Sequence, residues 1–227
     1  KQVRQMNKVV LVVAAHSDDE ALGCSGTMAK HIGAGDKVHV LFMTNGVDAR
    51  GEGEETNNER ENSALEAMNI LRVTSMQNLD FPDNRMDTVA LLDVTKAIEE
   101  KIAELHPEIV YTHHLGDLNI DHQITHKAVM TACRPTPNFC VKEIYAFEVL
   151  SSTEWQTPNN MPFIPNMFVD ISPYINLKKS VLEAYGQEMR EQPHSRSIAN
   201  VLRKSAVNGN LIGCAYAEAF SALRVIR

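Results

Sequence analysis

The chain has 227 residues, of which 44% are hydrophobic and 22% are charged, and its formal net charge is −7 at pH 7. This composition is that of a soluble globular protein, and the negative charge argues against nucleic acid or an anionic membrane surface as the main partner. No apolar run approaches the length of a membrane span, and the first residues lack the apolar region of a signal peptide. We therefore expect a cytoplasmic protein without membrane insertion.

Short apolar runs alternate with helical patterns along the first 130 residues. The apolar runs predict strands at 8–15, 37–44, 74–81 and 108–114. The helical patterns predict helices at 21–35, 58–73, 87–107 and 122–133. Farther along, we expect strands at 141–150 and 168–172, helices at 175–190 and 197–207, and a strand or short helix at 216–226. The alternation predicts an α/β fold with a Rossmann-like, doubly wound, mainly parallel sheet and a C-terminal elaboration.

The whole chain, 1–227, is expected to form one domain, since no internal repeat or low-complexity tract divides it. Residues 1–7 are expected to be disordered or foreign to the native chain, with Met6 as its candidate start. The four cysteines are scattered without a CxxC pair, which favours free thiols in a reducing compartment. A bridge between Cys133 and Cys140 is the less favoured alternative.

A polar loop follows each of the first four expected strands. The loops are HSDDE (16–20), NGVDARG (45–51), FPDNRMD (81–87) and THHLGDLNIDH (112–122). Ligands of open parallel sheets bind at the carboxyl ends of the strands, so all four loops are expected at the edge of the sheet where a ligand would bind.

Imidazole and carboxylate groups gather in these loops. His16, Asp19 and His122 are the kind of ligands that zinc or another divalent first-row metal takes, with a fourth position left for water. Asp18 is placed to act as the general base beside the metal. Two alternatives are weighed against this hypothesis. The acids can form a plain solvated helix start, or His122 can pair with His126 in an HxxxH metal site.

These residues resemble a known family. AHSDDEALGCSG (15–26) is similar to the pattern A-H-P-D-D-E-x-L-G-C-G-G of the LmbE-like, or PIG-L, metal-dependent deacetylases, with Ser17 and Ser25 as departures. GDLNIDH (116–122) is similar to the second family motif, and YAEAF (216–220) to bacterial members that process sugars. The resemblance implies zinc-dependent removal of an N-acetyl group from an amino sugar. By position it makes His16, Asp19 and His122 the ligands and Asp18 the base.

Asn119 departs from the family pattern, which often has a histidine there that stabilises the oxyanion or protonates the leaving amine. An asparagine amide can donate a hydrogen bond to an oxyanion but cannot be a general acid. We expect Asp18 to return its proton to the amine, with His114 assisting. Asp121 is expected to orient a neighbouring imidazole or to cap the following helix. His113 is interpreted as structural.

Four further residues are candidates for contacting the substrate. Arg50 and Arg85 lie in loops at the active edge, where surface salt bridges are the plainer interpretation, and His194 with Arg196 is placed to close the pocket. The expected substrate is a GlcNAc-type sugar, glycoside- or nucleotide-linked and related to surface polysaccharides, or a bacillithiol-type glucosaminide. A nucleotide-sugar glycosyltransferase and a non-catalytic sugar-binding protein are the alternatives from other classes. Like many members of the family, the chain is expected to form a homo-oligomer.

Overall fold

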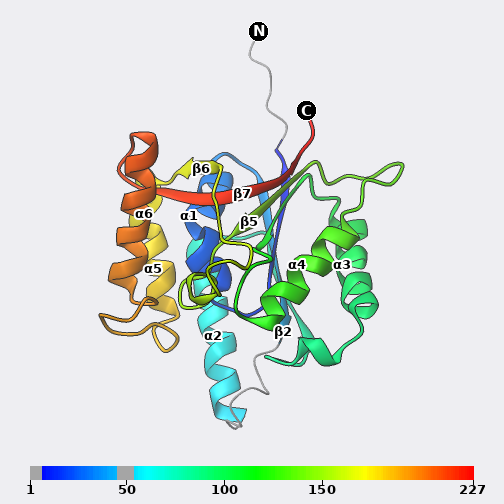
Figure 1. Cartoon of the computed structure of the whole chain (residues 1–227), viewed down its shortest axis with the longest axis horizontal. Helices are drawn as coiled ribbons and strands as arrows, with labels where there is room; N and C mark the ends of the chain where they lie inside the picture. The colour runs from blue at the N-terminus through cyan, green and yellow to red at the C-terminus, as the bar shows by residue number, and fades with distance from the viewer. Residues whose placement is uncertain (1–6, 45–53) are drawn as a thin grey trace.

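The computed structural model describes residues 7–44 and 54–227, which form a central sheet with helices on both faces (Figure 1). The strands are β1 (Val9–Ala14), β2 (Lys37–Thr44), β3 (Ser75–Phe81), β4 (Ile109–His113), β5 (Glu143–Phe147), β6 (Met167–Asp170) and β7 (Ala217–Val225). The helices are α1 (Asp19–Gly33), α2 (Glu54–Leu71), α3 (Leu91–Leu105), α4 (Ile120–Ala132), α5 (Ile175–Ala184) and α6 (Ile198–Ile212). In Figure 1, α1, α2, α5 and α6 cover one face of the sheet, and α3 and α4 cover the other.

The strand order within the described residues is β3-β2-β1-β4-β5-β7-β6. Neighbours from β3 to β5 pair in parallel, whereas β7 is antiparallel to both β5 and β6. The chain moves outward from β1 to β3 and then returns to β4 on the other side of β1. The carboxyl ends of β1 and β4 therefore flank the switch point, where doubly wound sheets bind their ligands. The predicted fold class is confirmed.

The central strand β1 is buried on both faces, which explains its continuous run of apolar residues. Val10 and Val12 belong to the core beneath α1, α2 and α5, while Leu11 and Val13 belong to the core beneath α3 and α4. The helix α1 packs so closely that a Cβ on Gly23 would lie 2.4 Å from the ring of Phe147 in β5. This close packing holds the first turn of α1 against the end of the sheet.

A buried ion pair ties α1 to the C-terminal part of the chain. Lys178 of α5 is 1% exposed, and its Nζ lies 2.6 Å from Oε1 of Glu218 in β7. The same ammonium donates to the backbone carbonyls of residues 21 and 22, each at 3.0 Å. Glu218 in turn accepts the backbone N–H groups of Gly26 and Thr27 at 2.9 and 2.7 Å. The pair thus binds consecutive turns of α1 from the side.

Three predicted elements differ in detail from the structure. The helix predicted at 87–107 is divided into a short 3-10 turn, Met86–Thr88, and α3, because Val89 between them is extended. The helix predicted at 175–190 ends at Ala184, where Tyr185 leaves helical geometry. The undecided segment 216–226 is a strand, since β7 finds hydrogen-bonding partners on both sides.

Two expectations about the whole chain meet the structure here. Each of the four cysteines is a free thiol, as favoured from their spacing. Among the described residues, no helix combines the length and the apolar character that crossing a membrane requires.

Candidate active site

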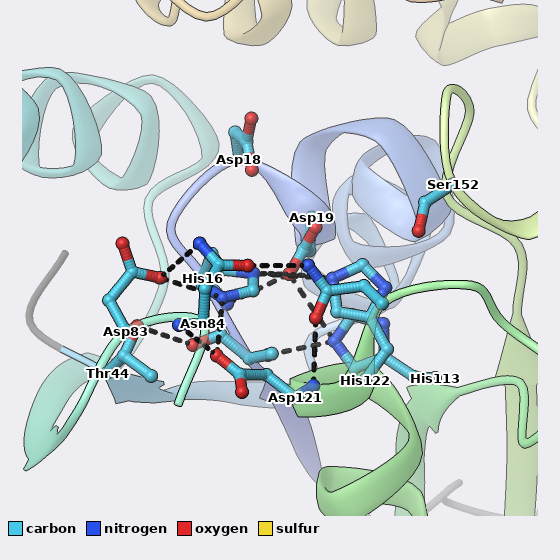
Figure 2. A network of polar contacts seen from close by, with 12 residues as sticks. His16, Asp18, Asp19, Thr44, Asp83, Asn84, His113, Asp121, His122 and Ser152 are labelled. Atoms are coloured by element: carbon cyan, nitrogen blue, oxygen red, sulfur yellow. Dashed lines mark hydrogen bonds and ion pairs between the residues drawn. The ribbon is translucent and has the colours of Figure 1, made fainter. Parts of the chain in front are cut away.

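Three candidate ligands from distant parts of the chain converge at the switch point. His16 follows β1, Asp19 opens α1, and His122 lies in the first turn of α4. Nδ1 of His16 lies 3.3 Å from Oδ2 of Asp19 and 3.3 Å from Nε2 of His122, and that Nε2 is also 3.3 Å from the same carboxylate oxygen. Figure 2 shows the three side chains pointing toward one another.

This triangle has the dimensions of a metal site. In a tetrahedral zinc centre with bonds of about 2.0–2.1 Å, the ligand atoms lie about 3.3 Å from one another. Two imidazole nitrogens and one carboxylate oxygen are also the donor types that catalytic zinc takes. His16, Asp19 and His122 could therefore hold a divalent cation with one position open.

The pKa values of His16, Asp19 and His122 are shifted in the directions that favour positive charge on the two imidazoles and negative charge on the carboxylate. Burial acts to lower the pKa of His122, but Asp19 and Asp117 raise it to about 9. Burial likewise opposes the charge on His16, yet Asp121, Asp19 and Asp83 raise its pKa well above the usual value. Burial acts to raise the pKa of Asp19, whereas His122 and His113 bring it well below its ordinary range. The buried carboxylates thus favour positive charge at the place where the triangle lies.

Two buried carboxylates hold the outer side of the imidazole rings. Oδ1 of Asp117 lies 3.1 Å from Nδ1 of His122, and Oδ2 of Asp121 lies 3.0 Å from Nε2 of His16. Asp121 also accepts the backbone N–H groups of Asn84 and Met86 at 2.6 and 3.0 Å. Such carboxylates fix the tautomer and the direction of a metal-binding histidine.

Of the two roles expected for Asp121, that of helix cap is wrong. Asn119 is the N-cap residue of α4, and its side-chain oxygen accepts the backbone N–H of Asp121 at 2.8 Å. The amide nitrogen of Asn119 donates to Oδ1 of Asn84 at 2.9 Å. Asp121 itself is fully buried, and its 3.0 Å contact with Nε2 of His16 is one from which it can orient that ring.

Asp18 stands next to the ligand cluster in an unusual backbone conformation. Its φ of 118° and ψ of −25° lie outside the regions that non-glycine residues favour, and strain of this kind concentrates at functional sites. The carboxylate is 3% exposed, and Arg196 donates a hydrogen bond to it at 2.8 Å. Burial raises the pKa of Asp18 to about 7 against the effect of Arg196, and Asp19 adds to the rise. A carboxyl group with such a pKa can both accept and return a proton near neutral pH.

The ligands and Asp18 line one polar cavity of about 190 Å³. The residues around it are His16, Ser17, Asp18, Asp19, Arg60, Asp83, Asn84, Asn119, His122, Ser151, Ser152, Glu188 and Arg196. Of the predicted substrate-binding residues, Arg85 is exposed and does not line this cavity. His194 is also outside it, with its ring against Trp155. Arg50 and the loop 45–51 that contains it lie outside the described residues.

The structure separates the two neighbouring histidines, and neither of them lines the cavity. Nε2 of His114 is 2.7 Å from the carbonyl oxygen of Met161, and this side chain does not line the cavity. His113, interpreted as structural, stacks on His122 with ring centroids 4.0 Å apart. β4 ends at His113, whose ring lies on the same face of the sheet as Tyr111, packs against Phe147, and accepts the backbone N–H of Ala15 at 2.8 Å. His126 instead approaches the carbonyl of His113 at 2.8 Å, away from the ligand triangle.

Several residues of the cavity had no signal in the sequence. Arg60 comes from α2. Its Nε lies 3.0 Å from Oε1 of Glu188, and its Nη1 lies 3.9 Å from Oδ2 of Asp83. Ser151 and Ser152 come from the Pro- and Asn-rich segment after β5. These positions lie on helix faces or irregular segments, where no spacing rule points to a site. The polar loop after β3, which contains Asp83, was the available signal for that side of the cavity.

A comparison with protein-family models shows which family this chain belongs to. The model described as "PIG-L: GlcNAc-PI de-N-acetylase" matches residues 11–133, more than half of the chain. The chain belongs to the PIG-L family. The match contains His16, Asp18, Asp19 and His122, which bears out the resemblance seen in the sequence motifs, and it assigns the chain to a family of deacetylases.

Three other proteins resemble the chain along most of its length. "Uncharacterized deacetylase YaiS" from Escherichia coli (strain K12) is 29% identical over 184 residues, which are 78% of this chain and 90% of that protein. A diacetylchitobiose deacetylase from Thermococcus kodakarensis is 27% identical over 241 residues, which cover 93% of this chain and 81% of that protein. The solved structure of the conserved protein TT1542 from Thermus thermophilus superposes with a TM-score of 0.77 at 27% identity, covering 96% of both chains.

The PIG-L match does not include the opposite wall of the cavity. Ser151, Ser152, Glu188 and Arg196 all follow residue 133, where the family model ends. The ligands therefore come from the matched part of the chain, and the residues that face them come from the C-terminal part.

Proposed function

We propose that the chain is a metal-dependent hydrolase that removes the acetyl group from an N-acetylated amino sugar. The observation that carries the proposal is the 3.3 Å triangle of His16, Asp19 and His122 beside the buried carboxyl group of Asp18. Deacetylase relatives, one of them named for diacetylchitobiose, support a sugar with an acetamido group as the substrate. Zinc is the metal that this donor set favours, and another divalent first-row metal is the alternative.

The residues of the cavity suit amide hydrolysis. A metal bound by the triangle would polarise the amide carbonyl and make a water molecule more acidic. Asp18 takes the proton of the attacking water, for which its pKa of about 7 is well matched. Asn119, at the rim of the cavity, donates a hydrogen bond to the oxyanion through its side-chain amide. Asp18 then gives the proton to the departing amine, so that acetate and a free amino sugar leave.

The alternatives from other classes have less support. A glycosyltransferase that binds a metal diphosphate relies on carboxylates and phosphate oxygens, whereas the triangle contains two imidazoles. A non-catalytic sugar-binding protein has no need of a strained, buried carboxyl group beside the ligands, yet Asp18 has a φ of 118° and is 3% exposed.

Metal content and acetate release test the proposal together. We expect about one metal ion per chain from elemental analysis, and acetate from at least one of N-acetylglucosamine, N,N′-diacetylchitobiose and UDP-N-acetylglucosamine. A chelator should abolish release and added zinc should restore it. The His122→Ala variant should lose metal and activity, whereas His114→Ala, altered outside the cavity, should keep both. Failure to bind zinc or any other divalent first-row metal would overturn the proposal, and metal binding without any acetate release would favour the sugar-binding alternative.

A further inference from the structure

We propose that Arg196 is a positioning residue for catalysis, which holds the carboxylate of Asp18 in the orientation from which it takes a proton. This inference rests on the proposed function, because it gives Arg196 its role through the general base. No family motif quoted above includes Arg196, which lies beyond the matched residues 11–133.

The guanidinium group of Arg196 is held at two points within the cavity wall. Nη1 donates to Oδ2 of Asp18 at 2.8 Å, and Nε donates to Oγ of Ser151 at 3.0 Å. Because the guanidinium is planar and rigid, two fixed nitrogens determine where the whole group lies. A charged hydrogen bond from so fixed a donor restricts the rotation of the carboxylate that accepts it.

The backbone that carries Arg196 is itself anchored. Its N–H donates to Nδ1 of His194 at 3.0 Å, and its carbonyl accepts the N–H of Arg190 at 3.3 Å. The next residue, Ser197, is the N-cap of α6 and accepts the N–H of Asn200 at 3.2 Å. The arginine therefore projects from the start of a capped helix, which is a firm support for a side chain that orients another.

The charges around Asp18 give this contact its importance. Asp19 and Glu188 line the same cavity and repel the carboxylate of Asp18. Among the described residues, Arg196 is the side chain that hydrogen-bonds to that carboxylate, while Arg60 lies 3.0 Å from Glu188. Without Arg196, the buried carboxylate would face the two acids without its hydrogen-bonded cation, and turning away from them would take it out of the reactive position.

Kinetics of two substitutions and one control test the proposal. For Arg196→Ala we expect kcat to fall roughly tenfold to a hundredfold, as for a misplaced catalytic group, with little change in KM and full metal content. Added guanidinium should restore part of kcat, since it can occupy the vacated place. Arg196→Lys should retain intermediate activity, because one ammonium cannot reproduce both contacts of the planar group. Arg190→Ala is the matched control, since Arg190 lies in the same loop and donates to the carbonyls of residues 187 and 189.

Two kinetic results would overturn the role of Arg196. They are a kcat within twofold of wild type in Arg196→Ala, and an equal loss in Arg190→Ala, which would assign the effect to the loop. A crystal structure of Arg196→Ala gives a readout that needs no substrate. An Asp18 carboxylate that keeps its place and orientation there would contradict the proposal. If the wild-type protein releases no acetate from any sugar, the proposed function fails, and the position of Asp18 in this variant still decides whether Arg196 orients it.

Discussion

The hydroxyl of Tyr185 donates a hydrogen bond to Oε1 of Glu20 at 2.8 Å, although 165 residues separate the two in the chain. The second oxygen of Glu20 accepts the backbone N–H of Asp18 at 3.1 Å. One fully buried carboxyl group therefore connects the end of α5 with the strained turn that presents the proposed base. This contact explains how the backbone of Asp18 is kept at a φ of 118°.

The buried Glu20 predicts a pH dependence of stability. Burial raises its pKa from 4.5 to about 8, against the hydrogen bond from Tyr185. Between these two values the folded protein retains a proton that the unfolded chain has lost. The stability that the folded protein gains from this proton is fully present below the pKa of Glu20 in the unfolded chain. It is lost as the pH rises through the pKa of Glu20 in the folded protein.

Thermal unfolding of metal-free protein checks this prediction. From pH 5 to pH 8, the Tm of wild type should fall relative to that of Glu20→Gln, which cannot titrate. Parallel curves for the two proteins would show that Glu20 does not change its protonation on unfolding.

The rate of hydrolysis should depend on the ionisation of Asp18. Burial raises its pKa to about 7, and a general base works only in its ionised form. We expect kcat/KM to rise about tenfold per pH unit on the acidic side and then to level off. A bound cation nearby moves this limb to lower pH. Asp18→Asn should lower turnover by roughly 10²–10⁴-fold without loss of metal. Persistence of the acidic limb in that variant would assign it to another group.

The carboxylates behind the imidazoles should control metal affinity. Asp117 lies 3.1 Å from His122, and its hydrogen bonds contribute to a pKa of about 2 even though burial opposes it. Asp117→Asn and Asp121→Asn should each weaken metal binding roughly 10–100-fold, because the ligand ring loses its orientation and basicity. Competition with a chromophoric chelator measures this directly. Asp93→Asn, on the exposed side of α3, should bind metal as the wild type does.

The fold could be predicted where local chemistry and the tertiary structure agree. β2 coincides with the predicted strand 37–44, because a strand buried on both sides has a continuous apolar run. The division at Val89 was not predictable, since in the turn before it the N–H of Met86 bonds to Asp121 of α4, which is distant in the sequence. Long-range contacts of this kind leave no periodic trace in the sequence.

The site could be predicted as far as strand ends determine it. His16, Asp19 and His122 follow β1 or β4, and the rule for parallel sheets brings such residues together. Arg196 could be expected only in general terms, because it comes from the loop between α5 and α6, whose path depends on the packing of both helices. The position of His114 outside the cavity could not be predicted, because it depends on the last residue of β4, and strand ends are the least certain feature of a sequence pattern.

The buried pair of Lys178 and Glu218 predicts a large effect on stability. The two side chains are 1% and 4% exposed, so removal of one partner leaves an uncompensated charge in the interior. Lys178→Met should lower the free energy of unfolding by about 3–5 kcal/mol. Lys179 is the next residue in the chain and forms an exposed ion pair with Glu183. Lys179→Met should therefore change the free energy of unfolding by less than about 1 kcal/mol. Denaturant titration of both variants tests this, and equal midpoints would contradict it.

The same pair has a consequence for how the protein is made. Glu218 binds α1 at Gly26, a residue that leaves the ribosome 192 positions earlier. The turn with the proposed base precedes α1, whereas the carboxylate that binds α1 lies in β7. A nascent chain therefore lacks this support of the proposed catalytic centre until β7 has been synthesised. A fragment that stops at residue 133 would contain the whole family match and still lack the contacts of Lys178 and Glu218 with α1.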